Sequence, residues 1–426
     1  EYNLYADSIP GLKLWLDSKD VNADNARDTA ADFLAGGKVS QWYDRSGNSN
    51  HVSQGANGNM PTASGNQINN LPTLTFGGSQ FLSANNSLGL NGSPSITVVM
   101  VAKSSADNAG RLVTLGSSSG TAGQIMSLAQ DASFQFNDGS LDFPGSFHGA
   151  ATLGSFLRKN PSGHGDGQFA LNGTDVNGTS TNGGNTLNMP SSGGNLLVGA
   201  GRGTNGAIND QYSGDIAEIL VFDRALHPWV LKKVEGYLAY KWGLENNLPT
   251  SHHASSEQPS FGGTQDIFFP ADPTAPEYDD GNGNWQWNVG ANAGSIELDG
   301  YAESGQDLTY VSSNTSVATV SGNVLTIVAE GTSTITASQA GDWHYTAATP
   351  VSRVLTVISK QAQTITFAMT DQGLSTTPYT LDATASSSLP VTYEITEGAD
   401  KVTYTSSNNQ ITFDSIGQVK IKASQA

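Results

Sequence analysis

Short apolar runs, each followed by a turn rich in asparagine and glycine, recur along the first 253 residues of this chain. The clearest of them cover residues 73–76, 95–103, 111–115, 124–128, 167–171, 195–199 and 215–222. Runs of this length are typical of strands, and asparagine and glycine are favoured in the turns that join strands. The pattern therefore predicts an all-β fold, built as a sandwich or a barrel.

One helix is predicted after the last of these runs. That run, DIAEILVF, is almost continuously apolar, which indicates a central strand covered on both faces. Pro228 then favours a helix start, because the first helical residue needs no donor. Apolar residues recur at helical spacing from Val230 to Trp242, and Gly243 favours a helix end. We expect this helix to pack on the edge of the sandwich.

Composition excludes several classes of partner. The chain has 426 residues and carries 38 Asp and Glu against 19 Lys and Arg, a net charge of −19. This charge argues against nucleic acid and against anionic membrane surfaces. The sequence has no cysteine, so no disulfide can staple it, and no apolar run approaches the roughly 20 residues of a membrane span. We expect neutral partners, or partners bridged by cations.

An acidic loop after the apolar alternation 12–16 carries a pattern of oxygen ligands. Asp20, Asn22, Asp24 and Asp28 stand at relative positions 1, 3, 5 and 9, the spacing of a calcium loop. Relative position 12, usually glutamate, is Ala31 here, so a complete EF-hand with its two helices is not expected. The pattern predicts a lone loop stapled by structural calcium; the alternative is a solvated acidic turn. The turn that starts at Asp44 is expected to be structural, with side-chain oxygens accepting from backbone donors.

Four pieces of sequence carry a resemblance to a known family. They are LWLD (14–17), SQWYDRSGNSNH (40–51), SGDIAEILVFDRAL (213–226) and EGYLAYKWGLENNLP (235–249). Residues 1–253 thereby resemble the laminin-G-like, concanavalin A-like lectin/glucanase module of large secreted and surface proteins of bacteria. The resemblance implies a jelly-roll sandwich of two antiparallel sheets. It does not fix a function, because that fold hosts lectins, hydrolases and adhesion domains.

No catalytic residue is assigned. A glucanase of this kind would carry Glu-x-Asp-x-x-Glu on one strand, and the sequence lacks that motif. Asp215 and Glu218 are three residues apart, so on a regular strand they would face opposite sides. We expect Glu218 to make a buried structural pair, with Arg224 or a loop amide.

The rest of the chain contains an internal repeat. Residues 298–310 align with 381–393, and ASQA at 337–340 recurs at 423–426. After a polar linker, 254–262, we therefore predict two modules, 263–360 and 361–426, which resemble bacterial immunoglobulin-like repeats. The second is shorter and is expected to be truncated. The predicted fold class is thus all-β, a concanavalin A-like jelly roll followed by two immunoglobulin-like sandwiches.

An insertion in the first repeat, 279–294, holds Trp285 and Trp287. Spaced by two on a strand, both rings would lie on one face, where they could stack on sugar rings. These two tryptophans are the candidate carbohydrate contacts. The alternative is that they pack over the linker and join the first repeat to the lectin-like domain.

Together these features predict a non-catalytic, calcium-stabilised region that binds glycans in a secreted or cell-surface bacterial protein. We expect it to be extracellular and monomeric, with no nucleic-acid partner and no membrane insertion. Two alternatives stay open. In the first, the chain is a structural or protein-binding spacer without a sugar site. In the second, it is an accessory part of a polysaccharide-degrading enzyme, or a glycoside hydrolase itself.

Overall fold

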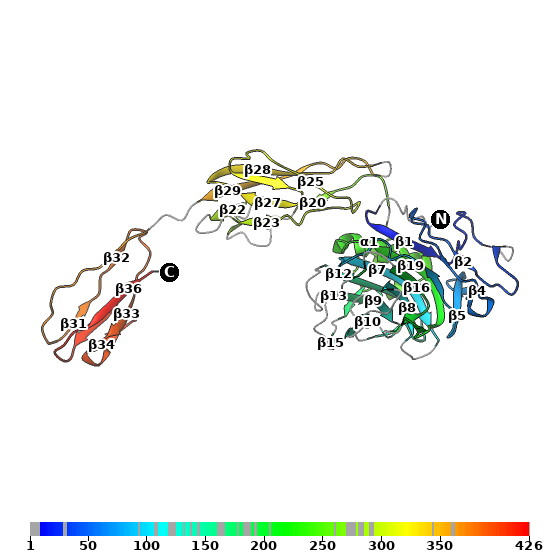
Figure 1. Ribbon diagram of the computed structural model, residues 1–426. Helices are drawn as coiled ribbons and strands as arrows, with labels where there is room; N and C mark the ends of the chain where they lie inside the picture. Colours follow the sequence, from blue (N-terminus) through cyan, green and yellow to red (C-terminus); the bar gives the residue numbers. More distant parts are fainter. Residues whose placement is uncertain are drawn as a thin grey trace.

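The computed structural model of the protein is shown in Figure 1. It describes residues 9–425 apart from 29–31, 93, 106–109, 118–124, 130, 132, 137–138, 143–144, 160–166, 177–178, 182–188, 191–193, 204–205, 260, 270–277, 280–284, 289–293, 343–344 and 359–362. The described residues form one large β-sandwich followed by two smaller ones, so the predicted all-β class is confirmed.

The large sandwich, here called the lectin-like unit, consists of two antiparallel sheets. The first sheet runs β14-β13-β12-β7-β19-β5-β4, and β1 also pairs with β19. Its strands are β1 (Leu12–Asp17), β4 (Thr62–Ile68), β5 (Leu71–Gly77), β7 (Ile96–Ser104), β12 (Thr152–Arg158), β13 (Gly167–Leu171), β14 (Thr174–Val176) and β19 (Ser213–Phe222). We call it the covered sheet, because its central strands are buried along almost their whole length.

The second sheet has nine strands in the order β15-β11-β10-β9-β8-β16-β6-β3-β2. They are β2 (Gln41–Trp42), β3 (Val52–Ser53), β6 (Leu82–Ala84), β8 (Arg111–Ser117), β9 (Ile125–Ala129), β10 (Ser133–Phe136), β11 (Gly139–Asp142), β15 (Thr179–Thr181) and β16 (Gly194–Val198). A short hairpin, β17 (Gly201–Arg202) and β18 (Ile208–Asn209), follows β16, and the 3-10 turn η3 (Asn57–Asn59) precedes β4.

The covered sheet separates two hydrophobic cores, and strand alternation decides which residue enters which. In β7, Val98 and Met100 point into the core between the sheets, while Val99 and Val101 point to the other side. That other side is closed by helix α1 (Pro228–Trp242), with the 3-10 turns η4 (Glu245–Asn247) and η5 (His253–Ser255) after it. The predicted doubly covered central strand is confirmed as β19.

Helix α1 begins and ends where the sequence indicates. The side chain of His227 accepts from the backbone N–H of Trp229 at 3.3 Å, and Pro228 takes the first helical position. Gly243 ends the helix in the left-handed region, at φ 68°. Apart from α1, the described residues form only 3-10 turns among their helical segments, and none has the length and apolar character that a membrane span needs.

The segment predicted as a linker, 254–262, packs against the lectin-like unit. Ala254 is fully buried beside Gly236 of α1, and Phe261 lies against the same core. A Cβ on Gly236 would approach the Ala254 Cβ to 2.5 Å, so the glycine permits this close contact. The segment therefore fastens to α1 before the chain enters the next module.

Module 1 and module 2 are the smaller sandwiches. Module 1 contains β20 (Ile267–Phe268), β21 (Tyr278–Asp279), β22 (Trp285–Asn288), β23 (Ser295–Glu297), β24 (Tyr301–Ala302), β25 (Thr309–Ser312), β26 (Ala318–Ser321), β27 (Val324–Ile327), β28 (Gly331–Ser338) and β29 (Val351–Ile358). Module 2 contains β30 (Ile365–Thr366), β31 (Ser375–Thr380), β32 (Thr384–Ala385), β33 (Thr392–Glu397), η6 (Ala399–Lys401), β34 (Val402–Thr405), β35 (Gln410–Phe413) and β36 (Lys420–Ser424). Each has a hydrophobic core of its own.

Candidate functional site

The acidic loop after β1 folds around the carboxylate of Asp20. Its Oδ1 accepts from the Asp24 N–H at 3.0 Å, and its Oδ2 accepts from the Asn25 N–H at 2.9 Å. Asn25 adopts φ 66°, a left-handed conformation that asparagine tolerates better than most residues. The loop is thus a tight turn whose backbone donors point at a carboxylate, as a calcium loop requires of its first ligand residue.

Asp28 closes the same loop and is left partly unsatisfied. Its Oδ2 accepts from the Val21 N–H at 2.5 Å, but its buried Oδ1 has no hydrogen-bond partner. Burial raises the pKa of Asp28 to about 6, and repulsion from the carboxylates of Asp20, Asp32 and Asp24 adds to the rise. A cation placed among these carboxylates would give Asp28 Oδ1 a partner and would offset the repulsion between the carboxylates.

The described residues do not form a finished metal cage. No three His, Asp or Glu side chains in the described part of the chain are arranged to hold an ion, and the Nε of Arg45 lies 3.4 Å from Asp20 Oδ2. Binding would require the loop to draw its side chains together and Arg45 to shift. Calcium on Asp20, Asn22, Asp24 and Asp28 therefore stays a prediction, with the bare Asp28 Oδ1 as the feature that fits it.

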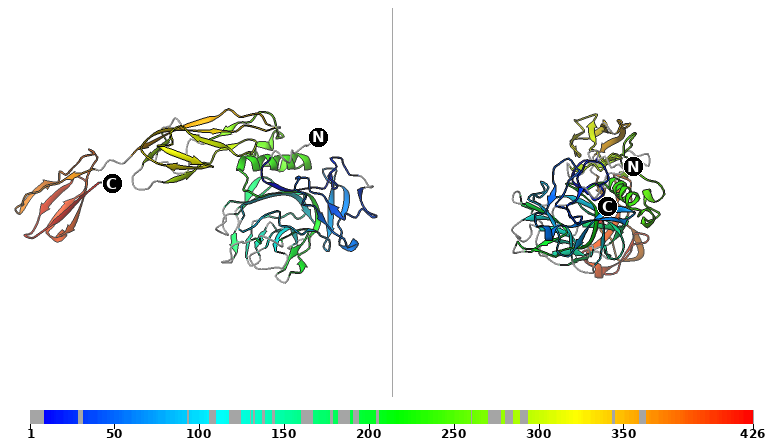
Figure 2. Two further views of the ribbon diagram at one scale, coloured as in Figure 1. Left: turned by 45° about the horizontal axis from the view of Figure 1, so that its top comes forward. Right: turned by 90° about the vertical axis from the view of Figure 1, so that its right-hand side faces the viewer.

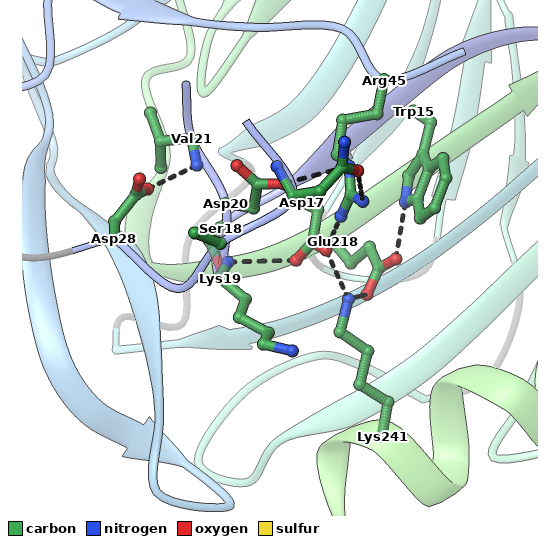
Figure 3. A network of polar contacts seen from close by, with 12 residues as sticks. Trp15, Asp17, Ser18, Lys19, Asp20, Val21, Asp28, Arg45, Glu218 and Lys241 are labelled. Carbon is green, nitrogen blue, oxygen red and sulfur yellow. Dashed lines mark hydrogen bonds and ion pairs between the residues drawn. The ribbon is translucent and has the colours of Figure 1, made fainter. Parts of the chain in front are cut away.

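A buried network of charges lies directly beneath this loop (Figure 3). Lys241, near the end of α1, places its Nζ 2.7 Å from Glu218 Oε2 on β19 and 2.7 Å from Asp17 Oδ2 on β1. Arg45 contributes the second cation, with Nη1 2.7 Å from the same Asp17 oxygen. The carboxylates of Asp17 and Glu218 therefore face two cations, and Arg45 also reaches the carboxylate of Asp20 in the loop.

Neutral donors complete the coordination of Glu218, which is fully buried. The indole N–H groups of Trp15 and Trp242 donate to its two oxygens at 2.7 and 2.8 Å, and the Tyr237 hydroxyl donates at 3.1 Å. Burial raises the pKa of Glu218 even though Lys241 lies beside it. Burial alone would also raise the pKa of Asp17, but Lys241 and Arg45 together bring it below its usual value.

The network corrects two predictions about β19. Glu218 does make a buried pair, but its partner is Lys241, while Arg224 pairs with Asp307 of module 1. Asp215 and Glu218 do not face opposite sides, because a β-bulge between Ile216 and Glu218 shifts the alternation. Asp215 accepts from the hydroxyl groups of two β5 threonines, on the face that α1 covers: Thr73 and Thr75.

A second buried carboxylate, Glu235 of α1, is likewise engaged. It accepts from the Ser155 hydroxyl at 2.5 Å, and its other oxygen lies 3.1 Å from His252 Nε2 and 3.0 Å from Lys232 Nζ. The carboxylate stands between the serine and the histidine, so Ser155 has no imidazole base beside it.

The predicted structural turn at Asp44 is confirmed, since its Oδ1 accepts from the Trp15 and Ser46 N–H groups, both at 2.9 Å.

The first turn of α1 also carries the contact with module 1 (Figure 2). Phe268 and Tyr301 of module 1 stack on each other at 4.8 Å between ring centroids. Tyr301 stacks on His227 at 3.5 Å, and Phe268 lies 5.7 Å from Trp229. These four rings, from two folding units, form one continuous aromatic contact.

Beside this contact lies a cleft of about 740 Å³, here called the junction cleft. The lectin-like unit lines it with Lys159 and residues 223–227 and 230, and module 1 lines it with 298–302, 305–308, 310 and 322–323. Clefts between folding units are common sites for ligands. Sequence reasoning missed the junction cleft, because its two walls are far apart in the chain.

The structure describes the strand that carries the two predicted sugar contacts, but not their side chains. Trp285 and Trp287 lie on β22, which pairs in parallel with β29. Their side chains fall outside the described residues, so their proposed stacking on sugar rings stays a prediction.

Comparisons with known proteins give structural neighbours. No family model and no curated protein matches the chain, so the laminin-G-like and immunoglobulin-like assignments stay predictions. Domain 4 of AbnA, a GH43 extracellular arabinanase from Geobacillus stearothermophilus in complex with arabinotriose, is 14% identical over 51% of this chain and 94% of its own, with a TM-score of 0.33. The CBM40 of Ruminococcus gnavus IT-sialidase bound to α2,3-sialyllactose is 14% identical over 36% of this chain and 91% of its own, with a TM-score of 0.29.

A third solved structure is that of a GH54 α-L-arabinofuranosidase mutant soaked with 4-nitrophenyl α-L-arabinofuranoside. It is 13% identical over 70% of each chain, with a TM-score of 0.35. At such values of identity and TM-score, a functional assignment has to come from the residues of this chain.

Removing the ammonium group of Lys241 should destabilise the lectin-like unit. We expect Lys241→Met to lower the free energy of unfolding by about 3–5 kcal/mol, because Glu218 would be left buried with its charge uncompensated. The matched control is Lys13→Met, which breaks a half-exposed pair with Asp223 at 3.0 Å and should cost about 0–1 kcal/mol. Both free energies are measured by urea unfolding. If Lys241→Met costs no more than Lys13→Met, the network is dispensable for stability.

The calcium prediction is tested by Asp28→Asn. Wild type should melt at a higher temperature in calcium than in EDTA, and this difference should disappear in the variant. In EDTA the variant should be at least as stable as wild type, because it removes a repelled carboxylate and keeps an acceptor for the Val21 N–H. Asp223→Asn, outside the loop, should keep the calcium response. A wild type indifferent to calcium would refute the site.

Proposed function

We propose that this chain is the non-catalytic, carbohydrate-binding region of a secreted or cell-surface bacterial protein. The lectin-like unit and module 1 together hold the glycan, and module 2 extends the array. Calcium in the 20–28 loop stabilises the lectin-like unit and takes no direct part in binding. The observation that carries the proposal is the junction cleft, a cavity lined by polar and apolar groups of two units that are in contact.

The buried carboxylates of the covered sheet and of α1 favour binding over hydrolysis. Retaining glycosidases need two carboxylates about 5–5.5 Å apart that reach the substrate. Here Asp17 and Glu218 are buried and paired with cations, and Glu235 is buried against Lys232 and His252. Each of these acids has a structural task, so we place none of them in a reaction.

The contact between α1 and module 1 also supports a binding role. A purely extending spacer needs only tandem modules, whereas here stacked rings, an ion pair and a half-buried lysine join the two units. Lys233 of α1 donates to the Glu303 carbonyl at 3.4 Å and lies over the rings of Phe261 and Tyr345 at 5.8 Å. A fixed orientation of this kind keeps the two walls of a shared site in register.

A glycan array tests the proposal directly. The complete chain should bind immobilised oligosaccharides in millimolar calcium, and it should release no reducing sugar from the same glycans in solution. A folded chain that binds none of them would favour the structural-spacer alternative. Release of reducing sugar, lost when a named carboxylate is replaced, would instead identify an enzyme.

A further inference from the structure

The two walls of the junction cleft are held together at its rim. Arg224 of the lectin-like unit pairs with both carboxylate oxygens of Asp307 in module 1, at 2.7 and 3.5 Å. His227 stacks on Tyr301 across the same boundary. Gly305 of module 1 faces the side chain of Val230 on α1, where an added Cβ would lie 3.1 Å away. Contacts of three kinds therefore set the width of the cleft.

Most charges on the walls are already paired. Asp307 pairs with Arg224, and Asp223 pairs with Lys13 at 3.0 Å. Within the described part of the chain, Lys159 and Asp299 are the charged lining residues that make no ion pair. One comes from each wall, and both side chains are exposed.

Lys159 and Asp299 line the same cleft as His227, so the two charges face one space. Burial lowers the pKa of His227 to about 4; Asp299 acts to raise it and Lys159 to lower it further. His227 itself is neutral near pH 7, so the open charges of the cleft are one anion and one cation.

This charge balance selects the class of ligand. A carboxylate accepts hydrogen bonds from hydroxyl groups, and an ammonium group donates to hydroxyl or ring oxygens. Because the open charges cancel, the cleft has no excess cation to bind a uronic or other acidic sugar. The ring of Tyr301 already stacks on those of His227 and Phe268, so the proposed recognition uses hydrogen bonds.

We infer that the junction cleft is a composite site for a neutral oligosaccharide, with Asp299 of module 1 and Lys159 of the lectin-like unit as its direct polar contacts. The inference rests on the proposed function and deepens it, since it assigns the site and the class of glycan. The volume of about 740 Å³ falls within the roughly 300–1,000 Å³ of small-molecule sites and accommodates a short oligosaccharide.

The test uses the complete chain and three single variants, each checked for an unchanged melting temperature. Neutral and uronic oligosaccharides are screened on an array, and the strongest neutral hit is titrated by calorimetry. Asp299→Asn and Lys159→Gln should each weaken binding about tenfold, equivalent to about 1.4 kcal/mol. Glu330→Gln, an exposed acid of module 1 outside the cleft lining, should bind as wild type does.

Different outcomes separate the two proposals. If wild type binds a neutral glycan and neither cleft variant weakens it, the composite site is overturned while the proposed function stands. If only uronic oligosaccharides bind, the ligand class is overturned. If the folded wild type binds no glycan at all, both proposals fall.

Discussion

The buried ammonium group of Lys241 is the interaction on which the architecture of the lectin-like unit depends. It sits on α1 and reaches carboxylates on β1 and β19, so one side chain ties the helix to two strands that are far apart in sequence. Buried charges are tolerated only when they are paired, and this requirement fixes where α1 lies on the covered sheet. Arg45 extends the network to the acidic loop, which links the predicted calcium site to the same core.

The placement of α1 on the covered sheet also matters for the proposed function, because the N-terminal end of the helix borders module 1. Its first turn supplies His227, Trp229 and Val230 to the boundary with module 1, and the junction cleft lies beside them. A helix that shifted on the sheet would carry one wall of the cleft with it. Relative motion of neighbouring domains is the usual expectation when their interface is small and polar. Here stacked rings and an ion pair oppose such motion.

Local pattern was enough to predict the strands, the doubly covered β19 and the limits of α1, because Pro228 and Gly243 act on the backbone where they stand. The orientation of Glu218 could not be derived, since it depends on a bulge at Ala217 that no periodicity reveals. Lys241 carried a signal that was missed: it follows Val234 by seven residues on the apolar face. The junction cleft had no local signal, because it requires the placement of two separately folded units.

Helix α1 joins the lectin-like unit and module 1 into one body. The chain has no cysteine, so two introduced ones can be labelled uniquely. Spin labels at Ser53→Cys on β3 and Thr332→Cys on β28, both exposed positions, report the distance between the two units. We expect a single narrow distance distribution in solution. A broad distribution, as expected of two units that move independently about a linker, would contradict it.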